Sequence, residues 1–186
     1  KNDIYSKMSK QRFRSDDEYM TPTYAWRDLC EYLDISKYTL WEPFYGSGKS
    51  TNILARFEYT VISNQSYDFF KDAPPTDFAS YLLITNPPFS KKKEVLEKIC
   101  LEWKLKTFIL LLPVGTIFTK YFNTIVHQSS LSYHICIPPA RIQFVKDGRK
   151  TRTNSFDTCW LVCGVNLPNT NVSGLHFLNA IGNRDA

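Results

Sequence analysis

Apolar segments alternate along the chain with segments whose apolar residues recur at helical spacing. We expect strands over residues 38–41, 59–63, 79–85, 107–112, 133–137 and 156–165. We expect helices over residues 24–33, 50–57, 92–104 and 118–129, and a hairpin near residues 146–150. Strands that are apolar throughout are typical of a parallel sheet with both faces covered by helices. The pattern therefore predicts a mostly parallel α/β sheet with helices on both faces and an antiparallel hairpin near its end.

The length of 186 residues suits one domain with a substantial core. Residues 1–18 are polar and charged, so we expect an amino-terminal extension followed by a single domain over residues 19–186. The extension has no apolar core of a signal peptide, and no run of about eighteen apolar residues predicts a membrane-spanning helix. Because the sequence begins at Lys1 rather than Met, we expect it to belong to a longer chain.

Five cysteines are scattered along the chain, and none forms a Cys-x-x-Cys pair. Cys159 and Cys163 lie in one expected strand at a spacing that puts both side chains on the same face. We expect buried, reduced thiols rather than zinc ligands or disulfides, and no metal site. Reduced thiols predict an intracellular protein, cytoplasmic or nuclear and not secreted.

The basic residues are clustered. The formal net charge of +5 is compatible with a polyanionic partner but does not by itself identify one. Lys91, Lys92 and Lys93 follow a loop-like segment, and residues 146–152 form a second basic cluster. Both clusters fit either phosphate contacts or ordinary solvated loops.

Residues 41–51 read WEPFYGSGKST and follow an expected strand. The closing Gly-Lys-Ser resembles a triphosphate-binding loop, but Pro43 stands where that loop needs its first glycine. Glu42 would repel phosphates and suits an ammonium group or ribose hydroxyls. Gly46 and Gly48 allow the backbone to approach a ligand closely. The segment therefore favours S-adenosylmethionine, an adenosine ligand with an ammonium group and no phosphates, over a nucleotide; a purely structural turn is the alternative.

Two further motifs flank this turn. Asn86-Pro87-Pro88-Phe89 (NPPF) closes the expected strand 79–85, and Tyr19-Met20-Thr21-Pro22 precedes the first expected helix. Together with Glu42 and the two glycines, in this order, they resemble the amino-methylating S-adenosylmethionine-dependent methyltransferases, above all the N6-adenine nucleic-acid methyltransferases. The resemblance covers roughly residues 19–120 and is weaker up to residue 165. It implies a Rossmann-like class I methyltransferase sheet and a catalytic domain over residues 19–186.

The resemblance implies a role for each motif. The side-chain oxygen of Asn86 and the carbonyl of Pro87 would accept hydrogen bonds from the amino group of adenine. Pro88 would stiffen the loop, and Phe89 would stack on the extruded base. Cofactor contacts would come from Tyr19, Thr21, Pro22, Glu42, Phe44, Gly46, Gly48, Asn64, Asp68 and Phe69. Nucleic-acid contacts would come from Lys91, Lys92, Lys93, Arg141 and Asn154.

We therefore expect transfer of a methyl group from S-adenosyl-L-methionine to N6 of a flipped-out adenine in DNA, with RNA as the other nucleic acid. Asn64 or Gln65 stands where the family usually has an acid that binds the ribose hydroxyls, which weakens the expected cofactor contact. Three alternatives stay open: an RNA guanine-N2 methyltransferase, a protein-glutamine methyltransferase, and a non-catalytic nucleic-acid-binding subunit. Because little room remains for target recognition, we expect loose sequence choice, a partner subunit or a region outside this sequence; no membrane partner is expected.

Overall fold

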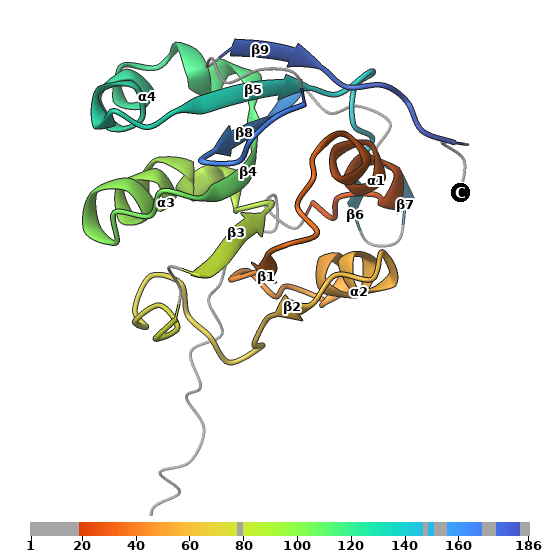
Figure 1. Ribbon diagram of the computed structural model, residues 1–186, viewed down its shortest axis with the longest axis horizontal. Coiled ribbons are helices and arrows are strands. Elements are labelled where there is room, and N and C mark those ends of the chain that lie inside the picture. Colours follow the sequence, from red (N-terminus) through yellow and green to blue (C-terminus); the bar gives the residue numbers. More distant parts are fainter. Residues whose placement is uncertain (1–18, 78–79, 147–148, 151–155, 169–173, 183–186) are drawn as a thin grey trace, which may run out of the picture.

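The computed structural model describes residues 19–77, 80–146, 149–150, 156–168 and 174–182 (Figure 1). The expected amino-terminal extension, residues 1–18, and the expected nucleic-acid contact Asn154 lie outside these ranges. Within them, no helix is long and apolar enough to cross a membrane.

A seven-stranded sheet forms the centre of the molecule, in the order β2-β1-β3-β4-β8-β5-β9 (Figure 1). Its strands are β1 (Thr39–Trp41), β2 (Val61–Ile62), β3 (Tyr81–Thr85), β4 (Phe108–Pro113), β5 (Tyr133–Ile137), β8 (Thr158–Cys163) and β9 (Gly174–Phe177). β8 runs antiparallel to both of its neighbours, β4 and β5, and the remaining pairs are parallel. The prediction of a mostly parallel α/β sheet with an antiparallel element is confirmed.

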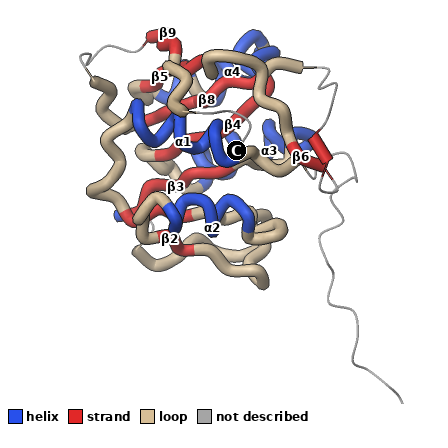
Figure 2. The backbone as a smooth tube through the Cα atoms, turned by 90° about the vertical axis from the view of Figure 1, so that its right-hand side faces the viewer, coloured by secondary structure: helices blue, strands red, loops and turns tan. Residues whose placement is uncertain are grey.

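Helices cover both faces of this sheet. They are α1 (Thr23–Tyr32), α2 (Lys49–Arg56), α3 (Lys92–Glu97) and α4 (Lys120–Ile125). Figure 2 shows α1 and α2 in front of the strands, and Figure 1 shows α3 and α4 on the other side. Short 3-10 helices are η3 (Phe89–Lys91), η5 (Val114–Phe118) and η6 (His127–Ser129), and η4 (Lys98–Glu102) is a short π-helix.

Several expected elements differ in length from those observed. The helix expected over residues 92–104 is α3 followed by η4, a short π-helix that sequence periodicity does not distinguish from an α-helix. The helix expected over residues 118–129 begins at Lys120, because the Thr119 hydroxyl caps it by accepting the Phe122 N–H at 3.2 Å. The hairpin expected near residues 146–150 is confirmed as β6 (Val145–Lys146) paired with β7 (Arg149–Lys150).

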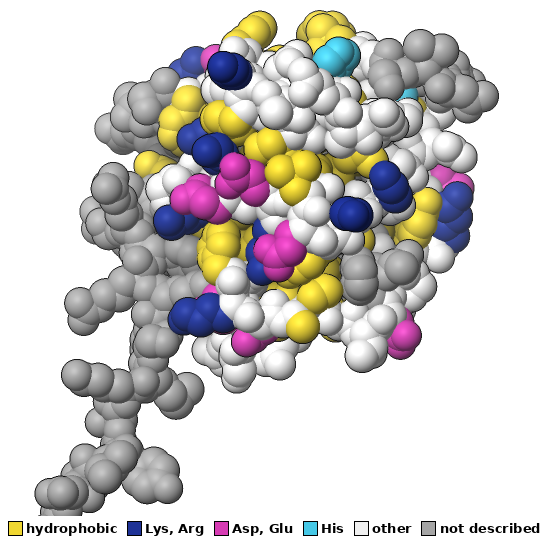
Figure 3. Space-filling view, turned by 90° about the vertical axis from the view of Figure 1, so that its left-hand side faces the viewer, with side chains coloured by type: hydrophobic (Ala, Val, Ile, Leu, Met, Phe, Trp, Pro, Cys, Tyr) yellow, Lys and Arg dark blue, Asp and Glu magenta, His cyan; other side chains and the backbone are white. Residues whose placement is uncertain are grey.

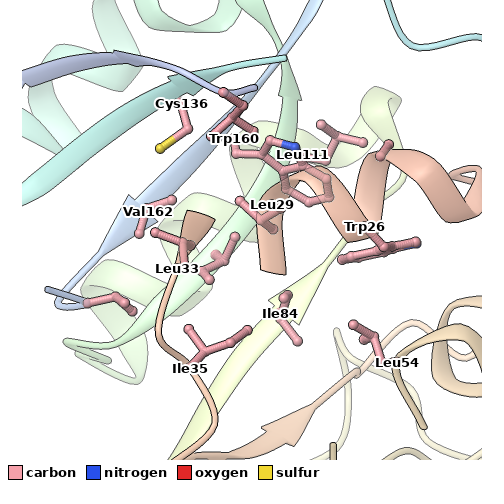
Figure 4. Close-up of a cluster of buried hydrophobic side chains, with 14 of the residues drawn as sticks. Trp26, Leu29, Leu33, Ile35, Leu54, Ile84, Leu111, Cys136, Trp160 and Val162 are labelled. Carbon is pink, nitrogen blue, oxygen red and sulfur yellow. The ribbon is translucent and has the colours of Figure 1, made fainter. Parts of the chain in front are cut away.

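Two apolar clusters, one on each face, hold the helices to the sheet. Under α1 and α2 the cluster includes Trp26, Leu29, Leu54, Ile84 and Trp160 (Figure 4). Under α3 and α4 a second cluster is built around Val95, Ile99, Phe108, Phe122 and Ile125. Cys159 and Cys163 both belong to the second cluster, so their expected common face is confirmed. All five cysteines are free thiols; four are buried and Cys30 is half-buried.

Candidate active site

The predicted motifs meet at one edge of the sheet. β2, β1 and β3 are parallel neighbours, with Trp41 opposite both Ile62 and Leu83. The residues that follow these strands therefore lie beside one another, at the carboxyl ends where ligands bind in open α/β sheets. The Ser63 hydroxyl, which follows β2, donates to the carbonyl of Glu42, which follows β1, at 2.7 Å.

The glycine-rich segment is a tight turn leading into α2. The Gly48 N–H donates to the Tyr45 carbonyl at 2.7 Å. Gly46 and Gly48 have φ values of 54° and 75°, in the region that favours glycine. A Cβ at Gly48 would lie 2.7 Å from the Tyr45 hydroxyl, whereas one at Gly46 would meet nothing closer than 3.9 Å. The turn thus requires both glycines, and space remains open beside Gly46.

The carboxyl group of Glu42 points into the protein. Glu42 is 1 % exposed, and its Oε1 accepts the Phe44 N–H at 3.0 Å and the Thr85 hydroxyl at 2.5 Å. Burial raises the pKa of Glu42 to about 8, against the opposing effect of these two hydrogen bonds. Glu42 therefore joins the turn after β1 to the last residue of β3. Its contact with the cofactor stays a prediction.

Asn86 is the first residue after β3, and its amide is held from one side. Its Nδ2 donates to the backbone carbonyl of Tyr19 at 2.8 Å. Its Oδ1 is buried and has no hydrogen-bond partner among the residues that the structure describes. Pro87 and Pro88 are both buried, and the Pro88 carbonyl accepts the Lys91 N–H at 2.9 Å. The NPPF turn thus contains one buried side-chain carbonyl oxygen, Asn86 Oδ1, that no described residue supplies with a hydrogen bond.

Phe89 lies in a cluster of aromatic rings. The Tyr19 ring stacks on it, with centroids 6.4 Å apart and planes 23° apart. Phe144 and Phe156 contact it edge-on, at 5.9 and 5.3 Å. The sequence places these two phenylalanines in residues 141–144 and 154–156, segments that either position the target strand or belong to a plain surface hairpin. The only sequence signal for them is their place on either side of the second basic cluster.

At the amino-terminal motif, Thr21 is 1 % exposed and Pro22 stands directly before α1. The Thr21 Oγ1, like Asn86 Oδ1, is one of eight buried side-chain polar atoms without a hydrogen-bond partner among the described residues. Both residues were predicted to contact the cofactor. They follow Tyr19, whose carbonyl holds Asn86. The amino-terminal motif and the NPPF turn are therefore direct neighbours.

The expected cofactor contacts Phe44, Asn64, Asp68 and Phe69 are only partly brought together. Phe44 and Phe69 pack ring to ring at 4.6 Å, and Phe69 is 1 % exposed. Asn64 is exposed and uses its Oδ1 to accept the Ser66 N–H at 2.9 Å. Asp68 forms an ion pair with Lys71 at 2.8 Å. Asn64 and Asp68 are thus engaged within their own loop.

The predicted nucleic-acid contacts separate into two groups. Lys91 and Lys93 lie where α3 begins, and form ion pairs with Glu94 and Glu97 at 3.1 and 3.5 Å. Lys92 instead donates to the carbonyl of Phe89 at 3.1 Å, so one lysine is bonded to the NPPF turn itself. Charges of both signs surround hydrophobic side chains on this face of the molecule (Figure 3).

Arg141 belongs to the other group. Its guanidinium forms two hydrogen bonds with the carboxylate of Asp157, at 2.6 and 3.1 Å.

Within the described ranges, no group of three or more His, Cys, Asp and Glu side chains is placed to hold a metal ion. No protein-family model and no curated protein matches the chain.

Proposed function

We propose that this chain transfers a methyl group from S-adenosyl-L-methionine to N6 of a flipped-out adenine in DNA. RNA is the alternative nucleic-acid acceptor. The observation that carries this proposal is the buried Oδ1 of Asn86, which lacks a partner among the described residues. Leaving a buried acceptor unpaired costs about 1–3 kcal/mol, so such atoms usually have a reason. An amino group entering the site would supply the missing donor.

The other part of the site supports the cofactor. Gly46 leaves open space at the carboxyl end of β1, next to the strand that carries Asn86. Thr21 adds a buried hydroxyl that can bond a polar ligand group. The mostly parallel sheet with one antiparallel strand also suits a Rossmann-like class I methyltransferase fold. When bound, S-adenosylmethionine supplies a sulfonium methyl group; Thr21, Pro22, Phe44, Gly46 and Gly48 are the residues that would hold it.

The chain's own residues would act on the amino group. Asn86 Oδ1 and the Pro87 carbonyl would accept hydrogen bonds from its two N–H groups, which would direct the nitrogen lone pair away from the ring and stabilise the developing positive charge. The cofactor would supply the methyl group to this nitrogen, with its sulfonium becoming a neutral thioether, while Asn86 and Pro87 would hold the nitrogen until one N–H proton is lost. Exact placement of the nitrogen is the main contribution of the protein.

One observation favours the non-catalytic alternative. Asn64 and Asp68, expected to contact the cofactor, make local contacts with Ser66 and Lys71 instead.

The acceptor is a separate question, because a guanine amino group or a glutamine amide would also donate a hydrogen bond to Asn86 Oδ1. The lysines beside the NPPF turn favour a nucleic acid over a protein acceptor. The five free thiols support an intracellular location. We expect sequence choice to be loose, or to come from a partner subunit or a region outside this sequence.

The deciding experiment is transfer of labelled methyl from S-adenosylmethionine to DNA, RNA and protein, followed by nucleoside and amino-acid analysis. The proposal expects N6-methyladenine, with DNA labelled more than RNA. Label found only in guanine or in glutamine would support the corresponding alternative. Binding of nucleic acid without any transfer would identify a non-catalytic subunit.

Asn86→Ala tests the atom on which the proposal rests. It should lower methyl transfer by at least about a hundredfold, the usual cost of removing one preorganised group that stabilises developing charge. Affinity for S-adenosylmethionine should stay close to that of the wild type, measured by calorimetry. Asn123→Ala, on the exposed surface of α4, is the matched control. Undiminished transfer by a folded Asn86→Ala protein would contradict the assignment.

A further inference from the structure

We propose that Tyr19 is a positioning residue for the target amino group, acting through Asn86 and Phe89, and not a cofactor contact as its sequence motif suggests. This inference rests on the proposed function for its catalytic consequence, but its structural part does not. It assigns separate tasks to adjacent residues, since Thr21 and Pro22 keep the cofactor role.

The first part of the argument is the hydrogen bond from Asn86 Nδ2 to the Tyr19 carbonyl, at 2.8 Å. The two ends of an asparagine amide have nearly the same shape but opposite hydrogen-bonding roles. A backbone carbonyl can only accept, so it selects the orientation in which Nδ2 faces it. Because the amide is planar, Oδ1 must then point away from Tyr19. The Tyr19 carbonyl thus decides that the buried, unpartnered atom is an acceptor.

The second part is the ring of Tyr19. It lies against three other rings. It stacks on Phe89, packs at a tilt against Phe144 with centroids 5.7 Å apart, and packs edge-on against Phe156 with centroids 6.0 Å apart. Phe144 is fully buried, which makes it a fixed support. The aromatic contacts therefore hold the Tyr19 peptide in place and limit the orientations open to Phe89. One residue orients both the acceptor and the aromatic side chain of the NPPF turn.

The third part is the backbone next to Tyr19. Met20 and Val145 exchange two hydrogen bonds, N–H to carbonyl in each direction, both at 3.0 Å. Val145 opens β6, the first strand of the hairpin in the second basic cluster. Tyr19 is thus held by its ring on one side and by the hairpin through Met20 on the other. A nucleic acid that contacts the hairpin would therefore affect the position of Tyr19, the residue that orients Asn86.

The test compares Tyr19→Ala, Tyr19→Phe and the control Tyr38→Ala, a half-buried tyrosine at the amino end of β1. Tyr19→Ala should lower kcat by about tenfold or more, because small misplacements of a positioned group can cost up to about a hundredfold. Affinity for S-adenosylmethionine should change less than about twofold, well below a tenfold step. Tyr19→Phe, which keeps the ring, should restore kcat. The control should leave kcat unchanged.

A second readout needs no activity. In the free protein, nuclear magnetic resonance should show the Asn86 side-chain amide protons protected from exchange, and Tyr19→Ala should remove that protection while Tyr38→Ala keeps it. Unchanged protection in a folded Tyr19→Ala protein would overturn the proposal, as would a loss of cofactor affinity with kcat intact. If the wild type transfers no methyl group but this protection depends on Tyr19, the proposed function fails and the positioning role stands.

Discussion

At the scale of single residues, Glu42 departs most from what its motif suggests. A carboxylate at the end of a first strand was expected to meet the cofactor as a charged group. Instead it is almost fully buried, with its acceptor oxygen bonded to Phe44 and Thr85. Burial raises its pKa from an ordinary value of 4.5 to about 8, so the folded protein holds this carboxyl mostly protonated at neutral pH.

This raised pKa gives a pH-dependent stability. Between pH 4.5 and about 8, folded Glu42 keeps a proton that the unfolded chain has lost. The free energy of unfolding should therefore fall as pH rises through this window, by about 1.4 kcal/mol per pH unit for this group. Glu42→Gln keeps the acceptor oxygen and cannot ionise, so it should remove that slope and be the more stable protein at pH 8.

Denaturant unfolding at a series of pH values measures this difference. Glu31→Gln, on the exposed surface of α1, is the matched control and should run parallel to the wild type. Curves for Glu42→Gln that also run parallel to the wild type would show that the carboxyl titrates normally in the folded protein.

Residue-level prediction succeeds or fails according to sequence distance. NPPF and the glycine turn are each contiguous, so their residue types and their places after β3 and β1 follow from the sequence. The Tyr19–Asn86 hydrogen bond joins distant residues and has no local pattern to reveal it. The same holds for Phe144 and Phe156 around Phe89. The predicted positions were therefore informative, but the orientation of Asn86 was not accessible.

At the scale of elements, the turn between β1 and α2 depends on Gly48. Its φ of 75° suits glycine, and an added Cβ would collide with the Tyr45 ring. Gly48→Ala should lower the free energy of unfolding by about 1–3 kcal/mol, the cost of a strained backbone position. Gly115→Ala is the control, since an added Cβ there meets nothing within 4 Å. Thermal unfolding of both variants checks this, and equal midpoints would contradict the prediction.

Elements were predictable where burial shaped the sequence. β3, β4 and β8 are almost wholly buried and read as apolar runs. β9 was not expected, because it is mostly exposed and lies at the edge of the sheet, where Leu175 and Phe177 are 58 % and 69 % exposed. β2 is shorter than the expected strand for the same reason: as the other edge strand, it is paired only over Val61 and Ile62. Edge strands carry a weaker pattern than central ones.

At the scale of the whole molecule, burial of cysteines in the two apolar clusters makes the reaction rate of their thiols a measure of folding. Burial raises the pKa values of Cys30, Cys100, Cys136 and Cys159 to about 12, and that of Cys163 well above its ordinary value. The thiolate is the form of cysteine that attacks thiol reagents, so the native protein should react slowly, with Cys30 first because it is half-buried.

All five thiols should react quickly once denaturant unfolds the chain, and the slow native rate should follow the fraction unfolded. Labelling with a chromogenic disulfide over a denaturant series measures both. Cys30→Ser identifies the contribution of the most accessible thiol. Rapid labelling of a cysteine other than Cys30 in the native protein would show that the clusters open independently of unfolding.

The two hydrogen bonds between Met20 and Val145 also bear on the order in which the chain is made. During synthesis from the amino terminus, β1, β2, β3 and β4 leave the ribosome before residue 145 does. Those four strands are contiguous neighbours in the sheet, so they can associate while the later part is still missing. The segment that carries Tyr19 must wait for its partner. The two hydrogen bonds that fix Met20 can therefore form only after residue 145 has been made.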